Sequence, residues 1–195
     1  MTELLSTRTA IEELAAAGCN HLAAREILAS GLAGPATVTR GAVLYAADRV
    51  RAIGNRSHAN PTALAEHTAL AGGVFVVRLR ARRPVEETAP PRTWIGFDAT
   101  QPNSTEQDDA LRMWWTMSES TAETIRQRCD REGFVPLVAT VGTLVATGRN
   151  IIAVDDYVDN QIAFIVTPAG PWFADHFADH WLNAGRGASW KWWTT

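Results

Sequence analysis

The chain has 195 residues, of which 18 are basic, 21 are acidic and 46% are apolar, so it can bury one medium-sized core or two small ones. Of the basic residues, 17 are arginines and the single lysine is Lys191. This composition excludes Walker-type phosphate loops, Schiff-base enzymes and pyridoxal enzymes, because each needs an internal lysine. The net charge of -3 also excludes a global positive field that would draw nucleic acid to the whole surface.

Several further classes are excluded by simple patterns. No run of eighteen apolar residues is present, and the first ten residues lack the basic and apolar regions of a signal peptide. We therefore expect a cytoplasmic protein with no membrane partner and no cofactor. Cys19 and Cys129 have no C-x-x-C neighbour, which excludes a disulfide framework and a cysteine-based zinc site and predicts two buried thiols.

The first sixty residues have a mainly helical pattern and a net charge of +1, from 6 arginines and 5 acidic residues. The expected elements are a helix through Ile11 that stops at Gly18, a helix over 20–30 with Asn20 as N-cap, a hairpin over 34–45 with Arg40 and Gly41 at its tip, and a helix over 46–54. We assign residues 1–58 to one domain.

Residues 61–195 carry a net charge of -4 and are predicted to form a second domain, rich in strands. Strands are expected at 74–82, 93–99, 111–117, 135–141, 143–147, 151–154 and 162–167, and a short helix over 61–70. Two longer helices are expected, one from a capping box at Ser120 and Glu123 to Gly133, the other from Pro171 to Gly185. Polar loops are expected at 84–92 and 101–109. The predicted fold class is α+β, with a mainly antiparallel sheet and two helices in the second domain.

The amino-terminal segment resembles the winged helix-turn-helix domains of the MerR and excisionase-like superfamily. The resemblance covers about fifty residues and rests on Thr7 and Ala10, the run ILASGLAG at 27–34, Leu44-Tyr45, Arg49-Val50 and Ile53. It implies that the helix from Asn20 enters the major groove of DNA and that the hairpin touches the backbone. The implied DNA-binding residues are Asn20, His21 and Arg25 on the helix and Thr37, Thr39 and Arg40 on the hairpin. A helical domain for protein contacts or dimerisation is the alternative.

A second candidate surface lies on the strand that opens the larger domain. With a period of two, Arg78, Arg80 and Arg82 point to the same side, and Trp94 and Trp114 on later strands extend this face into a basic and aromatic platform. Such a platform binds phosphates and stacks bases. The alternative is a solvated sheet face on which arginine stems cover the tryptophan rings.

The tandem ADHFADH places His176 and His180 four residues apart in the predicted last helix, where two imidazoles can face one metal ion. Two ligands are not a site, so no metal is assigned. The alternative is an amphipathic helix with its aromatic residues in the core.

These patterns together favour a DNA-binding regulatory protein, such as a bacterial transcriptional regulator or a phage repressor, with double-stranded DNA as its partner. The second domain would form a homodimer, contact a protein partner or add DNA contacts. One alternative is an enzyme or small-ligand binder that uses Asp98, Arg78, Arg80, His176 or His180. The other is a protein-binding adaptor or antitoxin-like module.

Overall fold

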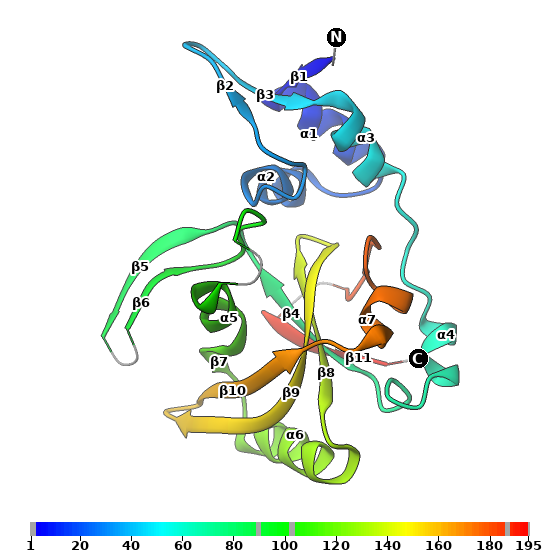
Figure 1. The fold of residues 1–195 in the computed structure, drawn as a ribbon, viewed down its shortest axis with the longest axis vertical. Coiled ribbons are helices and arrows are strands. Elements are labelled where there is room, and N and C mark those ends of the chain that lie inside the picture. The colour runs from blue at the N-terminus through cyan, green and yellow to red at the C-terminus, as the bar shows by residue number, and fades with distance from the viewer. Residues whose placement is uncertain (1–2, 89–90, 102–103, 186–187, 195) are drawn as a thin grey trace.

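The computed structural model describes residues 3–88, 91–101, 104–185 and 188–194 (Figure 1). The amino-terminal unit comprises β1 (Leu4–Ser6), α1 (Thr7–Ala16), α2 (His21–Ala29), β2 (Thr37–Val38), β3 (Val43–Ala46) and α3 (Ala47–Gly54). Its three described strands pair in the order β1-β3-β2, both pairs antiparallel. The predicted helices and hairpin are confirmed, whereas β1 was not expected.

Capping side chains explain where the first two helices begin. The Ser6 hydroxyl accepts a hydrogen bond from the backbone N–H of Thr9, and the Asn20 side chain accepts one from that of Ala23. Each bond satisfies one of the backbone donors that a helix start leaves without a partner. The apolar face of each helix then packs inward, with Leu14 of α1 and Ile27 of α2 both fully buried.

The larger unit contains β4 (Val74–Leu79), β7 (Trp115–Thr116), β8 (Val135–Val141), β9 (Leu144–Val158), β10 (Gln161–Pro168) and β11 (Trp190–Trp193). These six described strands form one sheet in the order β11-β4-β8-β9-β10-β7, and only the β4–β8 pair is parallel. The α+β class and the mainly antiparallel sheet are therefore confirmed. The sheet is so strongly curled that its two edge strands meet. The indole N–H of Trp190 on β11 donates to the Thr116 carbonyl on β7 at 2.7 Å.

Both faces of the central strand β4 are buried. Phe75, Val77 and Leu79 belong to a core that also includes the amino-terminal unit, while Val74 and Val76 belong to a second core under α7 (Pro171–His176). The helices α4 (Pro61–Glu66), α5 (Thr105–Arg112) and α6 (Glu119–Glu132) surround the sheet (Figure 1). No helix in the described part of the chain is long and apolar enough to cross a bilayer.

Several predicted boundaries in this unit were wrong for local reasons. The N-cap expected at Ser120 was wrong, because Ser118 accepts the hydrogen bond from the backbone N–H of Thr121, so α6 begins at Glu119, before Ser120. Residues 111 and 112 end α5, whose N-cap is Ser104, and do not begin a strand. The strands expected at 143–147 and 151–154 form one strand, β9, because the residues between them continue its ladder with β8.

Residues 84–88 and 91–92 of the segment expected to be a polar loop lie in the two strands of an antiparallel pair instead, whereas residues 89–90 are outside the described part of the chain. Strand β5 (Arg83–Thr88) pairs with β6 (Pro91–Ile95), with Arg83 opposite Ile95. Its prolines concealed it, although an isolated pair of edge strands tolerates proline because few of its N–H groups face a neighbour. We call this element the β5–β6 arm. It projects from the molecule on one side of α2 (Figure 1).

The last predicted helix was also wrong, because α7 ends at His176 and does not reach Gly185. Asp179 has a positive φ of 59°, which interrupts the helix. The chain then runs extended, and the backbone N–H of Val145 donates to the His180 carbonyl at 3.0 Å. His176 and His180 therefore do not share a helix face, and the expectation of two imidazoles facing one ion loses its geometric basis.

The extended segment joins the two units through Trp181, which is 3% exposed. Its backbone N–H donates to the Ser57 carbonyl, its carbonyl accepts from Ala59, and its indole N–H donates to the Ile53 carbonyl at 3.1 Å. Burying this side chain between the units accounts for the loss of the helix. One hydrophobic cluster runs from Leu5 through Trp181, so the two units share a core.

Candidate nucleic-acid interface

Helix α2 presents one stripe of side chains to solvent. Its buried face consists of Ala23, Ala24, Ile27 and Leu28, and its exposed residues are His21, Leu22, Arg25 and Ala29. Leu22 is 63% exposed. The predicted residues His21 and Arg25 thus lie on the accessible face. The Asn20 side-chain oxygen accepts the capping bond from the backbone N–H of Ala23, and its amide NH2 carries two donors for other contacts.

The opposite side of α2 is fixed to the larger unit. Gly142, in the turn between β8 and β9, lies so close that a Cβ there would be 2.7 Å from the Cβ of Ala23. The Glu26 carboxylate accepts the backbone N–H of Ala81 at 2.6 Å, and the Ser30 carbonyl accepts that of Ala99 at 2.8 Å. These contacts hold the helix with its exposed stripe outward.

The β2–β3 hairpin projects from the amino-terminal unit with Arg40 in its turn (Figure 1). The Thr39 side chain closes this turn, because its hydroxyl donates to the Ala42 carbonyl at 3.1 Å and accepts the Ala42 N–H at 3.2 Å. Thr39 therefore has a structural role in positioning Arg40. Thr37 and Arg40 are both exposed.

Ion pairs separate the arginines of the amino-terminal unit into two groups. Arg8 pairs with Glu12, Arg56 pairs with Asp179, and Arg51 holds both Glu3 and Glu13. The hydrogen bond and charge of Arg51 lower the pKa of Glu3. Within residues 3–60, no ion pair is found for Arg25, Arg40 and Arg49. These three side chains provide the uncompensated positive charge of the unit.

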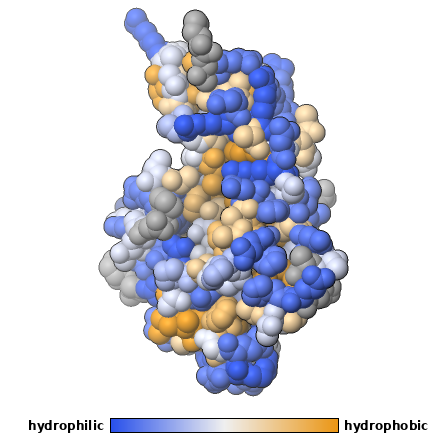
Figure 2. All heavy atoms as spheres, turned by 45° about the vertical axis from the view of Figure 1, so that its right-hand side comes forward, coloured by the Kyte–Doolittle hydropathy of each residue, from blue (hydrophilic) through white to orange (hydrophobic). Residues whose placement is uncertain are grey.

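The stripe on α2 borders two grooves. One, of about 800 Å³, lies between α1 and α2 and is lined by Arg8, Glu12, His21, Arg25 and others. The other, of about 580 Å³, lies between α2 and the β5–β6 arm and is lined by residues of both units. Leu28, Ala29 and Tyr45 line both grooves, so the grooves meet along α2. Figure 2 shows the notch between the two units from the side.

The predicted basic and aromatic platform is broken up in the structure. Because β4 is covered on both faces, Arg78 is half-buried and donates to the carbonyls of Ala184, Gly185 and Ala188. It supports the backbone of the carboxy-terminal segment and does not share an exposed ridge with Arg80 and Arg82. Arg80 is exposed but lines neither groove. Trp114 is half-buried between α5 and β7 and lines neither groove.

Arg82 and Trp94, in contrast, lie together in the groove beside the arm. The Arg82 guanidinium is 4.7 Å from the centre of the Trp94 ring and 3.1 Å from the Asp98 carboxylate. Burial of the Asp98 carboxyl favours a higher pKa, but hydrogen bonds from Thr100 and Arg82 outweigh burial and leave the pKa below its ordinary value. Asp98, a candidate enzyme residue by sequence, is therefore the ion-pair partner of Arg82. Its backbone N–H donates to the side-chain carbonyl oxygen of Gln107.

Sequence reasoning missed three residues of this surface, namely Arg49, Tyr45 as a groove residue, and Arg83. Arg49 lies against Gly34, where an added Cβ would meet its guanidinium. Arg83 is exposed and lines the groove between α2 and the arm. The run RLRARRP at 78–84 contains Arg83, but the alternation expected for a strand over 74–82 selects Arg78, Arg80 and Arg82. Arg83 was not selected because the segment after this strand was expected to be a loop.

Other candidate chemistry is not assembled. In the described ranges, no cluster of three or more histidine, cysteine, aspartate or glutamate side chains is placed to hold a metal ion. Both cysteines are buried as expected, and burial raises the pKa of each thiol, which disfavours the reactive thiolate. Comparison with protein-family models, with curated proteins and with solved structures gave no match.

Proposed function

We propose that the protein is a DNA-binding regulatory protein that reads duplex DNA through α2, with the β2–β3 hairpin as a wing on the neighbouring backbone. The order of two helices followed by a hairpin, with β1 added to the hairpin as a third strand, supports a winged helix-turn-helix interpretation of residues 3–54. The major groove of B-DNA, about 12 Å wide, admits an α-helix.

The observation that supports this function best is the distribution of uncompensated charge. Arg25 is on the exposed stripe of α2 and Arg40 is at the tip of the hairpin, whereas Arg8, Arg51 and Arg56 are paired with carboxylates. Glu26, the acidic residue of α2, is turned toward the backbone of Ala81. A phosphate backbone next to α2 would therefore meet cations without an opposing carboxylate on the helix.

The side chains on the stripe suit base recognition. Arginine donates two hydrogen bonds to guanine, and an exposed leucine contacts the methyl group of thymine. Leu22 and Arg25 lie near one another on the helix, being three residues apart. The exposed side chains of Leu22 and Arg25 therefore offer an apolar contact and a cationic contact side by side.

The test is selection of bound sequences from a pool of random duplexes, followed by binding of variants to the selected site. We expect Arg25→Gln to cost about 1–3 kcal/mol and to relax preference at one base pair, and Arg40→Gln to weaken all duplexes alike. Arg131→Gln, on α6 far from α2, is the control. Failure of the folded wild-type protein to enrich or retain any duplex would overturn the proposal.

A further inference from the structure

The base of the β5–β6 arm and the stripe on α2 belong to the same surface. Arg25 lines the groove on the α1 side of α2, and Arg83 lines the groove on the arm side. The two grooves share Leu28, Ala29 and Tyr45, so a ligand that lies across Ala29 reaches both arginines. Figure 1 shows α2 between the two projections, the β2–β3 hairpin on one side and the arm on the other.

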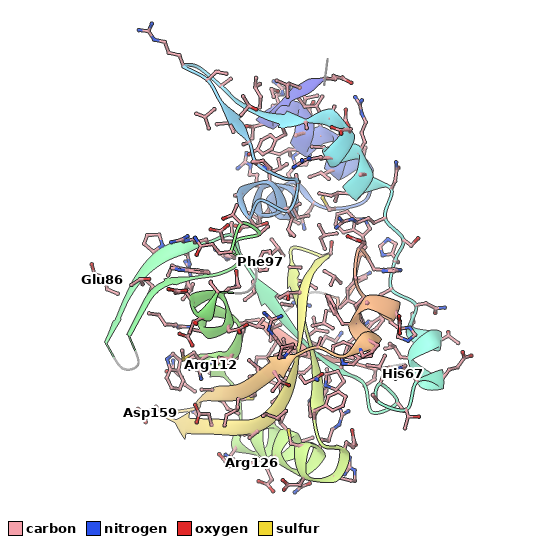
Figure 3. The ribbon with its side chains drawn as sticks, viewed as in Figure 1. His67, Glu86, Phe97, Arg112, Arg126 and Asp159 are labelled. Atoms are coloured by element: carbon pink, nitrogen blue, oxygen red, sulfur yellow. The ribbon has the colours of Figure 1, made fainter. Side chains whose placement is uncertain are left out.

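The arm is firmly attached where it meets this surface. Arg82 is held by Asp98 and stacks on the buried ring of Trp94, and its backbone N–H donates to the Phe97 carbonyl at 3.0 Å. Phe97 itself is buried just below α2 (Figure 3). The Glu26 carboxylate accepts the backbone N–H of Ala81, the residue that precedes Arg82. These contacts fix the direction of the arm relative to α2 before any ligand binds.

Arg83 differs from Arg82 in what neutralises its charge. The Arg82 guanidinium is paired with Asp98, whereas no ion pair is found for Arg83 in the described part of the chain. The groove that Arg83 lines is also lined by the small or rigid residues Gly31, Gly34, Pro35 and Ala36. Its carboxylate, Asp98, is paired with Arg82. Such a lining leaves room for a bulky polymer backbone to approach, and the groove is open and not enclosed.

The charge of the arm changes along its length. Its base carries Arg82 and Arg83, whereas Glu86 projects from the outer part of β5, away from α2 (Figure 3). A polyanion that followed the whole arm would meet this carboxylate. Arg92, on the facing strand β6, is half-buried and donates to the Met113 carbonyl. The exposed arginines Arg82 and Arg83 are at the base of the arm, and we expect an anionic contact there, next to α2.

We propose that Arg83 binds a backbone phosphate of the DNA that α2 reads, so that the arm grips the duplex on the side of α2 opposite the β2–β3 hairpin. This inference rests on the proposed function. It extends the interface from the amino-terminal unit to the larger unit and assigns the larger unit a direct part in DNA binding. Because a phosphate contact is independent of base identity, Arg83 contributes affinity and positioning without sequence preference.

The test measures duplex affinity against salt concentration for wild type, Arg83→Gln, Arg83→Lys and the control Arg131→Gln. Each lost phosphate contact lowers the slope of log K against log salt by about 0.9, and a change of that size corresponds to about a five-fold loss of affinity near physiological salt. We expect both changes for Arg83→Gln, with the selected sequence unchanged, and a near-normal slope for Arg83→Lys and Arg131→Gln. Equal thermal unfolding temperatures establish that all four proteins are folded.

Two results would overturn the assignment. A wild-type slope for Arg83→Gln means that this side chain does not contact phosphate, while the proposed function stands. A changed sequence preference for Arg83→Gln means that it contacts bases. If wild type binds no duplex, the proposed function itself fails. This outcome differs from failure of the Arg83 assignment, because it is seen with wild type alone.

Discussion

Single residues decide how α2 is held, and Gly142 is the clearest case. It has a φ of 62°, in the left-handed region, and an added Cβ would lie 2.7 Å from the Cβ of Ala23 and 3.1 Å from its Cα. Glycine is needed here twice over, for the backbone conformation and for the close approach of the helix. A turn residue of the larger unit therefore sets the position of the helix that we propose to read DNA.

Gly142→Ala is expected to lower the free energy of unfolding by about 1–3 kcal/mol, because the new side chain is strained and pushes against α2. Denaturant unfolding followed by circular dichroism measures the change. Gly41→Ala is the matched control, since a Cβ at Gly41 meets nothing within 4 Å and its φ is not in the left-handed region. Equal stability of the two variants would contradict the packing described here.

The ion pair of Asp98 with Arg82, at the base of the arm, depends on pH. The pKa of Asp98 in the folded protein lies below the ordinary value of 3.8, so the carboxylate stabilises the fold fully above that value and the contribution is lost as pH falls through the folded pKa. We expect Asp98→Asn to cost on the order of 2 kcal/mol at neutral pH. The difference from wild type should shrink below pH 3.8. A difference that is constant down to acid pH would contradict this role.

The N-caps of the helices were partly predictable from the sequence. Asn20 was identified from its position before an apolar periodic segment, and the structure confirms it. Ser118 was missed in favour of Ser120, because three serine and threonine residues compete at this helix start and the sequence does not show which hydroxyl reaches the free N–H groups. Ion-pair choices such as Arg82 with Asp98 were not predictable, since both depend on the arm that brings them together.

Among the elements, α2 provides the sharpest test of base recognition. Leu22 is exposed on the stripe next to Arg25, and we expect its side chain to contact a thymine methyl group. Leu22→Ala should leave the free energy of unfolding unchanged, because the side chain buries little surface in the fold, and should reduce preference for thymine at one position. Competition between duplexes with thymine and with uracil at that position measures this. Loss of stability without a change in preference would contradict it.

Element prediction succeeded where local periodicity and caps agreed, as for α2, α3 and the β2–β3 hairpin. It failed where pairing partners are distant or weak. Strand β1 has three residues and is stabilised by β3 about forty positions later, and the β5–β6 arm contains prolines that are typical of loops. The helical spacing of ADHFADH was overridden because Trp181 must reach the amino-terminal unit.

For the whole molecule, the shared core predicts cooperative unfolding of the two units. The predicted domain division at residues 58–61 is crossed by the backbone contacts of Trp181 with Ser57 and Ala59 and by the ion pair of Arg56 with Asp179. The 8 tryptophans of the chain all lie after residue 60. Tryptophan fluorescence therefore reports on the larger unit and, through Trp181, on its contact with the amino-terminal unit, whereas far-ultraviolet circular dichroism reports on the helices of both.

We expect the two signals to give coincident unfolding curves with a single midpoint. Trp181→Phe should lower the midpoint, because the indole hydrogen bond to the Ile53 carbonyl is lost, at a cost of about 0.5–1.5 kcal/mol, while that carbonyl keeps the backbone N–H of Arg56. Separate midpoints for wild type would mean that the units fold independently and that the larger unit does not support α2 as described.

We propose that duplex DNA binds across α2 and the β2–β3 hairpin. The most direct test is fluorescence anisotropy of a labelled duplex titrated at a series of low salt concentrations with wild type and with the Arg25→Gln/Arg40→Gln double variant. We expect saturable binding by wild type that weakens with salt, and a double variant whose slope is smaller by about 0.9, from the lost Arg40 phosphate contact, and whose affinity is at least ten-fold lower because the Arg25 base contact is lost as well. Folded wild-type protein that shows no saturable binding, or a double variant that binds as wild type does, would contradict it.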